Sequence, residues 1–168
     1  NPMMRCTALV LLLAAVALAL TLTTAQGPFD SSSFSFQQYR DYAGTVFTRP
    51  TPTLPTAEGK FLLTRPGKFD AQVRAWSGRA VSLRGALIQS GGNRMLEIAP
   101  ASVREASATL QLPPRAAQQA TMELAGEIAD SKCHLGVMNP GRGKVHRDCA
   151  VRCISGGVPP ALLVRDAT

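Results

Sequence analysis

Short apolar runs separated by turn residues constrain the fold of this chain more strongly than any other feature of its sequence. The runs KFLLT, AVSLRGALIQ and RMLEIAP lie between Gly59 and Pro100, together with the turn-forming stretches RPGK, WSGR and SGGN. Short, partly alternating apolar runs bounded by Gly, Pro, Ser and Asn at about ten-residue spacing are typical of antiparallel strands. The sequence therefore predicts a mainly β fold, with Ser90 to Asn93 as a hairpin turn.

A glycine inside the run VSLRGALI predicts a bend in that strand. Gly85 follows Val81 and Leu83 in the alternating pattern, and a glycine within a strand marks a bulge or a sharp bend. A bent strand followed by a hairpin is the common construction of a small OB-type barrel. The same pattern recurs from Met122 to Ile128, so we expect an OB-like antiparallel barrel, with two similar halves as an open alternative.

The N-terminal segment, residues 1–25, predicts export. Arg5 precedes an apolar stretch from Ala8 to Leu20, and small residues stand at Thr23 and Ala25. This pattern is typical of a secretory signal peptide, here with cleavage after Ala25. An uncleaved membrane anchor is the alternative, because a spanning helix needs about 20 apolar residues. Both interpretations place the remainder outside the cytoplasm, in the periplasm or on the outer face of the inner membrane.

Residues 26–58 are rich in Ser, Thr and Pro and predict a spacer in front of a β-rich domain at 59–168. Prolines fix φ and remove backbone donors, so the backbone from Arg49 to Pro55 is expected to be extended and unpaired. The stretch from Ala101 to Gln119 contains two adjacent prolines and predicts a short helix or an irregular crossover.

The last apolar run, Ala161 to Val164, predicts a final strand. An Asp-containing turn after a strand normally leads to a returning partner. The native chain is therefore expected either to continue past Thr168, or to pair this strand with an earlier one.

The charge balance is basic but does not predict nucleic-acid binding. Lys and Arg outnumber Asp and Glu by 18 to 11, for a formal net charge of +7. The basic residues are scattered singly, and the few aromatic residues do not alternate with them as a stacking platform requires. The expected contacts are instead with a membrane, through an uncleaved N-terminal segment, and with a membrane-protein partner.

Three cysteines and both histidines lie within residues 126–160. Removal of a signal peptide would also remove Cys6, the fourth cysteine. HRDCAVRCI predicts a helical turn with Gly156 as its C-cap. His146, Cys149 and Cys153 then stand at i, i+3 and i+7, on one face of the helix. Cys133, expected at the end of a preceding strand, can reach this face across a Pro-Gly loop.

Three chemistries are open for this cluster. In an oxidising compartment a disulfide from Cys133 to Cys149 or Cys153, with the third thiol passive, is the ordinary outcome. Alternatively, Cys133, His146, Cys149 and Cys153 form a sufficient ligand set for tetrahedral zinc. Thiol redox chemistry is the third, with Cys149 as nucleophile, His146 as base, and Cys133 or Cys153 resolving.

The residues beside Cys133 have less specific roles. His134 is a spare ligand candidate, but neighbouring residues on a strand point to opposite faces, so it is not expected to share an ion with Cys133. Asp130 and Lys132 predict either a polar shell around the site or a surface ion pair at a strand end.

The motif G-x3-D-x-K-C, G-x-M-x-P-G, H-x2-C-A-x2-C-I-x-G-G-x-P-P resembles a segment of a family of exported bacterial proteins of unassigned function. The matching positions are Gly126, Asp130, Lys132, Cys133, Gly136, Met138, Pro140, Gly141, His146, Cys149, Ala150, Cys153, Ile154, Gly156, Gly157, Pro159 and Pro160. The resemblance implies that the cluster is one unit and implies no activity.

Signals of common enzyme classes are missing from the sequence, which has no G-x-S-x-G, no Gly-rich phosphate loop and no H-E-x-x-H. The leading hypothesis is therefore an exported, non-enzymatic binding or accessory module whose cluster is stapled by a disulfide or binds a metal such as zinc. The alternative is a thiol-based redox protein that uses Cys149 with His146.

Overall fold

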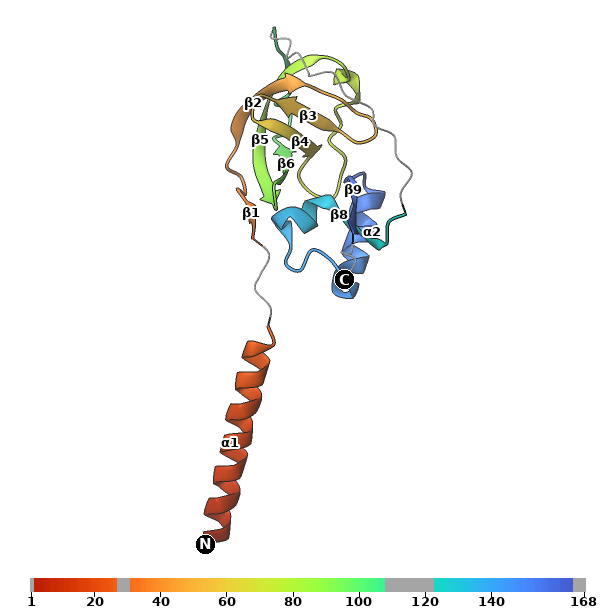
Figure 1. The fold of residues 1–168 in the computed structure, drawn as a ribbon. Helices are drawn as coiled ribbons and strands as arrows, with labels where there is room; N and C mark the ends of the chain where they lie inside the picture. Colours follow the sequence, from red (N-terminus) through yellow and green to blue (C-terminus); the bar gives the residue numbers. More distant parts are fainter. Residues whose placement is uncertain (1, 27–30, 108–122, 165–168) are drawn as a thin grey trace. The chain divides into compact units, whose positions relative to one another are not determined.

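The computed structural model describes residues 2–26, 31–107 and 123–164 and divides into two units, Asn1–Asp30 and Ser31–Thr168 (Figure 1). The first unit contains helix α1 (Pro2–Thr24), which has no buried residue. It is long and apolar enough to cross a membrane, with a mean hydropathy of 2.5 over its most apolar window. A signal peptide and a membrane anchor both satisfy this description.

The second unit is mainly β, as the sequence predicts. A mixed seven-stranded sheet has the order β1-β5-β6-β4-β3, with β2 and β7 also paired to β5. Its strands are β1 (Ser32–Phe34), β2 (Arg40–Thr45), β3 (Thr53–Thr56), β4 (Gly59–Thr64), β5 (Ala80–Ser90), β6 (Asn93–Ile98) and β7 (Arg104–Glu105). A single turn of 3-10 helix, η1 (Arg74–Trp76), lies between β4 and β5.

The hairpin predicted at Ser90 to Asn93 is confirmed. β5 and β6 pair in antiparallel register with Ser90 opposite Asn93, and both intervening glycines have positive φ. Two consecutive positive φ angles fit a tight turn whose twist matches the strands, which is why Gly-Gly suits this position. Along its other edge, β5 pairs with β2 at Ala80–Gly85 and with β1 at Ile88–Ser90.

The predicted spacer is wrong for its described residues. β1, β2 and β3 all belong to the sheet. Val46, which follows β2, and Leu54 of β3 belong to a core shared with Phe61, Leu83 and Leu96. Pro55 is accommodated because β3 ends the strand order, so its missing N–H breaks no interior pairing. Polar composition hid these strands because few of their residues are buried.

The sheet differs in detail from the expected antiparallel barrel. β4 and β6 are paired in parallel. The connection between these two strands runs through η1 and β5. The strand order ends at β1 and β3, so the described strands do not establish a closed barrel, although a bridge pairs Phe47 with Thr53. The two predicted halves are not alike, because Gly85 lies within the large sheet and Gly126 begins a separate two-stranded one.

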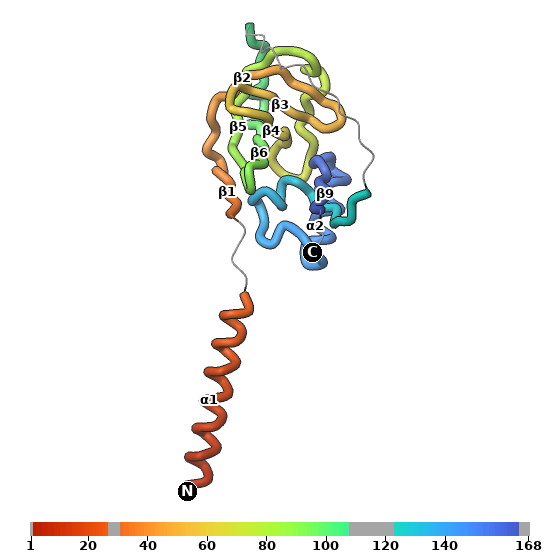
Figure 2. Tube along the Cα trace, viewed as in Figure 1, coloured from red at the N-terminus to blue at the C-terminus, as the bar shows by residue number. Residues whose placement is uncertain are grey.

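The C-terminal part of this unit forms the second, smaller sheet and the helical segments between its strands (Figure 2). β8 (Gly126–Asp130) pairs antiparallel with β9 (Pro160–Val164), so the last strand pairs with an earlier one. Between them lie the helical turn η2 (Cys133–Val137), the turn η3 (Lys144–His146) and helix α2 (Arg147–Ser155). Leu135 of η2 packs with Ile88 and Met95 of the large sheet. The crossover expected from Ala101 to Gln119 lies mostly outside the described residues.

Candidate functional site

Asp130 ends β8 and starts the helical turn that carries Cys133. The carboxylate of Asp130 accepts a hydrogen bond from the backbone N–H of Cys133 at 2.8 Å, the geometry of a helix N-cap. Cys133 is therefore on a helical segment, whereas the sequence interpretation placed it at a strand end. The sequence signal was present, because Asp-Ser-Lys-Cys places a capping residue three positions before Cys133.

The predicted helix carrying Cys149 and Cys153 is confirmed as α2, with His146 at its N-cap position and Gly156 at its C-cap position. Gly156 has helical dihedral angles, and the positive φ that ends the helix is at Gly157. The N–H of Gly157 and that of Val158 donate to carbonyls of α2, which closes the C-terminus.

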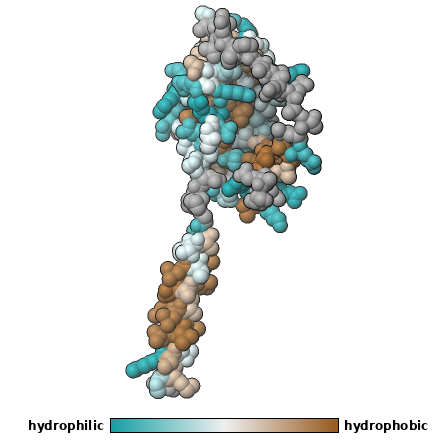
Figure 3. Space-filling view, in the orientation of Figure 1, coloured by the Kyte–Doolittle hydropathy of each residue, from teal (hydrophilic) through white to brown (hydrophobic). Residues whose placement is uncertain are grey.

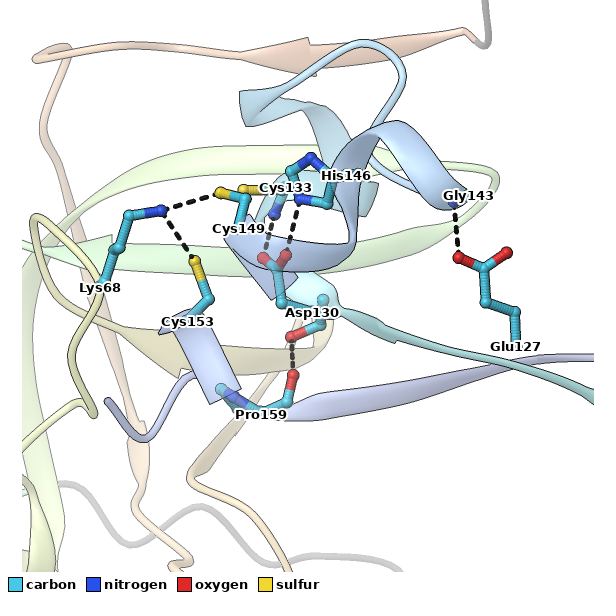
Figure 4. A network of polar contacts seen from close by, with 10 residues as sticks. Lys68, Glu127, Asp130, Cys133, Gly143, His146, Cys149, Cys153 and Pro159 are labelled. Atoms are coloured by element: carbon cyan, nitrogen blue, oxygen red, sulfur yellow. Dashed lines mark hydrogen bonds and ion pairs between the residues drawn. The ribbon is translucent and has the colours of Figure 1, made fainter. Parts of the chain in front are cut away.

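Three thiols and one imidazole converge on the buried side of α2 (Figure 4). Ligand atoms of Cys133, His146 and Cys149 lie within 4.8 Å of one another, and the same holds for Asp130, Cys133 and Cys153. All four cysteines of the chain are free thiols in the structure, so the expected disulfide and passive third thiol are not found. The three C-terminal thiols instead form one cluster, as the spacing predicts.

His146 is held by a fully buried carboxylate. Its Nε2 lies 2.9 Å from the Oδ2 atom of Asp130, and the two side chains are 4% and 0% exposed. A carboxylate only accepts, so Nε2 carries the proton and the lone pair of the neutral ring is on Nδ1. Asp130 thus fixes both the backbone of Cys133 and the tautomer of His146.

Lys68, which the sequence interpretation missed, contributes the positive charge of the site. Its Nζ atom donates to the sulfur of Cys149 at 2.8 Å and to that of Cys153 at 3.4 Å (Figure 4). Lys68 lies 81 residues before Cys149 in the chain, in the loop after β4. The only local sequence signal was the Pro-Gly turn at 66–67. This turn predicts a loop, but it does not predict which distant segment the loop contacts.

Glycines at the end of α2 allow the Lys68 loop to approach. A Cβ atom on Gly156 would contact the carbonyl oxygen of Lys68, and one on Gly157 would contact Asp70. The N–H of Asp70 donates to the carbonyl of Gly156 at 2.9 Å. The Gly-Gly pair of the motif therefore serves close packing against this loop as well as helix termination.

Lys132 holds the same loop from its other side. Its Nζ atom lies 2.5 Å from Oε2 of Glu97 on β6, and both side chains are buried. It also donates to the backbone carbonyls of Arg65 and Gly67. The expectation of a surface ion pair between Asp130 and Lys132 is wrong, because both are buried and each has a different partner.

The electrostatics divide the thiols into two kinds. Hydrogen bonding from Lys68 lowers the pKa of Cys149, and that contact in turn raises the pKa of Lys68. Burial raises the pKa of Cys133, with the Asp130 carboxylate adding to the effect. Burial also raises the pKa of Cys153. Among the three clustered thiols, Cys149 is therefore the one whose thiolate is stabilised.

The structure brings together all four predicted ligands and Asp130, whereas Lys132 pairs with Glu97 outside the ligand groups. His134 belongs to neither ligand group found among the described residues. Comparison of the chain with models of protein families, with curated proteins and with solved structures gives no match.

Proposed function

We propose that this protein is an exported binding or accessory module whose Cys133, His146, Cys149 and Cys153 bind a metal ion. The observation that carries the proposal is the meeting of three thiols and one imidazole from η2, η3 and α2. The ligand atoms of Cys133, His146 and Cys149 lie within 4.8 Å of one another, and Cys153 packs in the same cluster of thiols. Soft thiolates with an imidazole suit Zn²⁺, and thiolates also suit Cu⁺.

The surroundings of the cluster support a metal site. Asp130 orients His146 in the way that carboxylates orient metal-binding imidazoles. Metal binding requires deprotonated thiols, and the ammonium of Lys68 offsets part of the negative charge that three thiolates would bring. Zinc would act there as a structural or transferable ion, since four protein ligands leave no open position for a substrate.

Metal content tests the proposal directly. The chain from Gln26 onward would be purified without chelator and with reductant, then analysed for bound metal and free thiols. One zinc or copper ion per chain, lost in Cys133→Ser and Cys149→Ser but kept in His134→Ala, supports a metal site. A metal-free protein with one disulfide, unable to take up Zn²⁺ after reduction, contradicts it.

A thiol redox function is the second candidate, and the contact of Lys68 with Cys149 favours it. An ammonium at 2.8 Å stabilises a nucleophilic thiolate, and Cys133 and Cys153 lie beside it. Attack of Cys149 on the disulfide of a partner protein would form a mixed disulfide and release one partner thiolate. Attack by Cys153 or Cys133 would then release the second, leaving this chain oxidised by two electrons and the partner reduced.

Thiol exchange separates the two candidates. A redox module should reduce a small disulfide in a reaction abolished by Cys149→Ser, with no bound metal needed. Loss of exchange activity on adding stoichiometric Zn²⁺ would indicate that the thiols serve as ligands.

We also propose that the Ser31–Thr168 unit acts in the periplasm or on the outer face of the inner membrane. The length and hydropathy of α1 support export. Mass spectrometry of the mature N-terminus would distinguish cleavage after Ala25 from a retained anchor.

The large sheet is proposed to close as an OB-like barrel. The Phe47–Thr53 bridge, which joins the end of β2 to β3, supports this, as does the bent β5 that pairs with both β2 and β6. Amide exchange tests closure, because a closed barrel protects the N–H groups of Phe47 and Thr53 that bond across the bridge at 2.9 and 2.7 Å.

A further inference from the structure

A groove lies between β8 and α2 in the Ser31–Thr168 unit. It has a volume of about 610 Å³, and its walls come from Gly126–Ala129 and from α2 with the turn before it. Of the four proposed ligands, His146 borders the groove, whereas the three clustered cysteines and Lys68 do not line it. The groove therefore needs an explanation separate from the thiol chemistry.

Apolar side chains are exposed in and beside this groove. Ile128 and Val151, on opposite walls, are 59% and 58% exposed. Leu162 lies directly opposite Ile128 in the β8–β9 register and is 42% exposed, and Val164 is also exposed. In Figure 3 apolar side chains gather on the globular unit over this region. Four exposed branched aliphatic residues close together indicate a surface that is covered in use.

Positive charge accompanies the apolar side chains. Lys144 and Arg147 line the groove and are exposed. Arg142 is a further basic residue in its lining, and Glu127 is occupied by a hydrogen bond from the backbone N–H of Gly143. Exposed aliphatic side chains with cationic side chains beside them are typical of surfaces that bind anionic lipid bilayers.

We propose that this groove, lined by Ile128, Val151, Lys144 and Arg147, docks the globular unit on an anionic membrane surface. Two further features favour a bilayer over another occupant. The chain has a formal net charge of +7, which complements anionic headgroups. Ser32, where β1 begins, is only eight residues after Thr24, where α1 ends. If α1 is retained in the membrane, the chain length therefore keeps Ser32 within about 29 Å of the end of α1.

Vesicle binding tests the proposal on the chain from Gln26 onward. Removing α1 takes away no core residue, because the buried residues all lie in the other unit. The protein should sediment with phosphatidylglycerol vesicles at low salt and remain in solution with phosphatidylcholine vesicles. The double variant Lys144→Gln/Arg147→Gln should lower the partition coefficient about 30-fold. Ile128→Gln/Val151→Gln should lower it tenfold or more.

Matched controls keep the test specific. Lys60→Gln/Arg104→Gln removes equal charge from exposed positions on β4 and β7, and Phe36→Gln removes an exposed apolar side chain near β1. These variants should keep most of the binding. Equal losses in groove and control variants would overturn the proposal, as would absence of binding to phosphatidylglycerol. A stable dimer in solution that Ile128→Gln/Val151→Gln separates would also overturn it, by making a second copy the occupant.

Discussion

The Nζ atom of Lys68 lies 2.8 Å from the sulfur of Cys149, so a residue from the loop after β4 provides the cation for a thiol on α2. This contact connects the large sheet to the Cys/His cluster. Its consequence is chemical, because an ammonium in contact with a thiol stabilises the thiolate and makes that sulfur the most reactive of the cluster.

Lys68→Met is therefore expected to slow alkylation of Cys149. The native contact lowers the pKa of Cys149, so its thiolate persists at pH values where an ordinary thiol is protonated. Removing the ammonium moves the midpoint of alkylation to higher pH and lowers the rate of alkylation at neutral pH. Iodoacetamide labelling of the metal-free protein across pH, followed by peptide mass spectrometry, measures the midpoint and the rate.

Lys60→Met is the control and should leave the midpoint unchanged. An unchanged midpoint in Lys68→Met would mean that the contact between Lys68 and Cys149 does not form in solution.

Gly156→Ala is expected to destabilise the protein through a collision rather than through backbone strain. Gly156 has an ordinary helical φ of −80°, so alanine suits its backbone. Its Cβ, however, would overlap the Lys68 carbonyl. Displacing this loop should cost about 2 kcal/mol or more of the free energy of unfolding in urea. Gly78→Ala provides the contrast, because open space surrounds Gly78 and only its positive φ of 77° opposes alanine, at about 1 kcal/mol. Equal losses of unfolding free energy in Gly156→Ala and Gly78→Ala would contradict the packing role of Gly156.

Local patterns predicted the helix, the hairpin and the clustering of the C-terminal thiols. Helical spacing places Cys149 and Cys153 together on one face, and Gly91-Gly92 suits only a tight turn. These features depend on residues close in sequence. Lys68 and Glu97 could not be assigned to the site in this way, because their contacts with Cys149 and Lys132 join distant segments. The strands at 32–56 were missed because their burial is partial, so no continuous apolar run marks them.

Lys132→Met is expected to be strongly destabilising. It would leave the carboxylate of Glu97 buried without a charged partner and would free the carbonyls of Arg65 and Gly67. Breaking a buried ion pair from one side typically costs about 3 to 5 kcal/mol. The double variant Lys132→Met/Glu97→Met should recover much of this, since it removes the unpaired charge as well. Urea unfolding of both variants measures the difference, and a double variant no more stable than the single one would show that the loop contacts of Lys132 dominate.

Asp130→Asn separates the two roles of the buried carboxylate. Asparagine can still accept the hydrogen bond from the N–H of Cys133, so η2 should keep its cap. The negative charge that holds His146 is lost, however, and such partners of metal-binding histidines typically contribute about 10-fold to 100-fold in metal affinity. Competition with a chromophoric zinc chelator should therefore show weaker binding, while the far-ultraviolet circular dichroism stays unchanged.

Glu127→Gln is the matched control, because its partner is the backbone of Gly143 and not His146. Native zinc affinity in Asp130→Asn would contradict the role of this carboxylate in holding His146 for the metal ion.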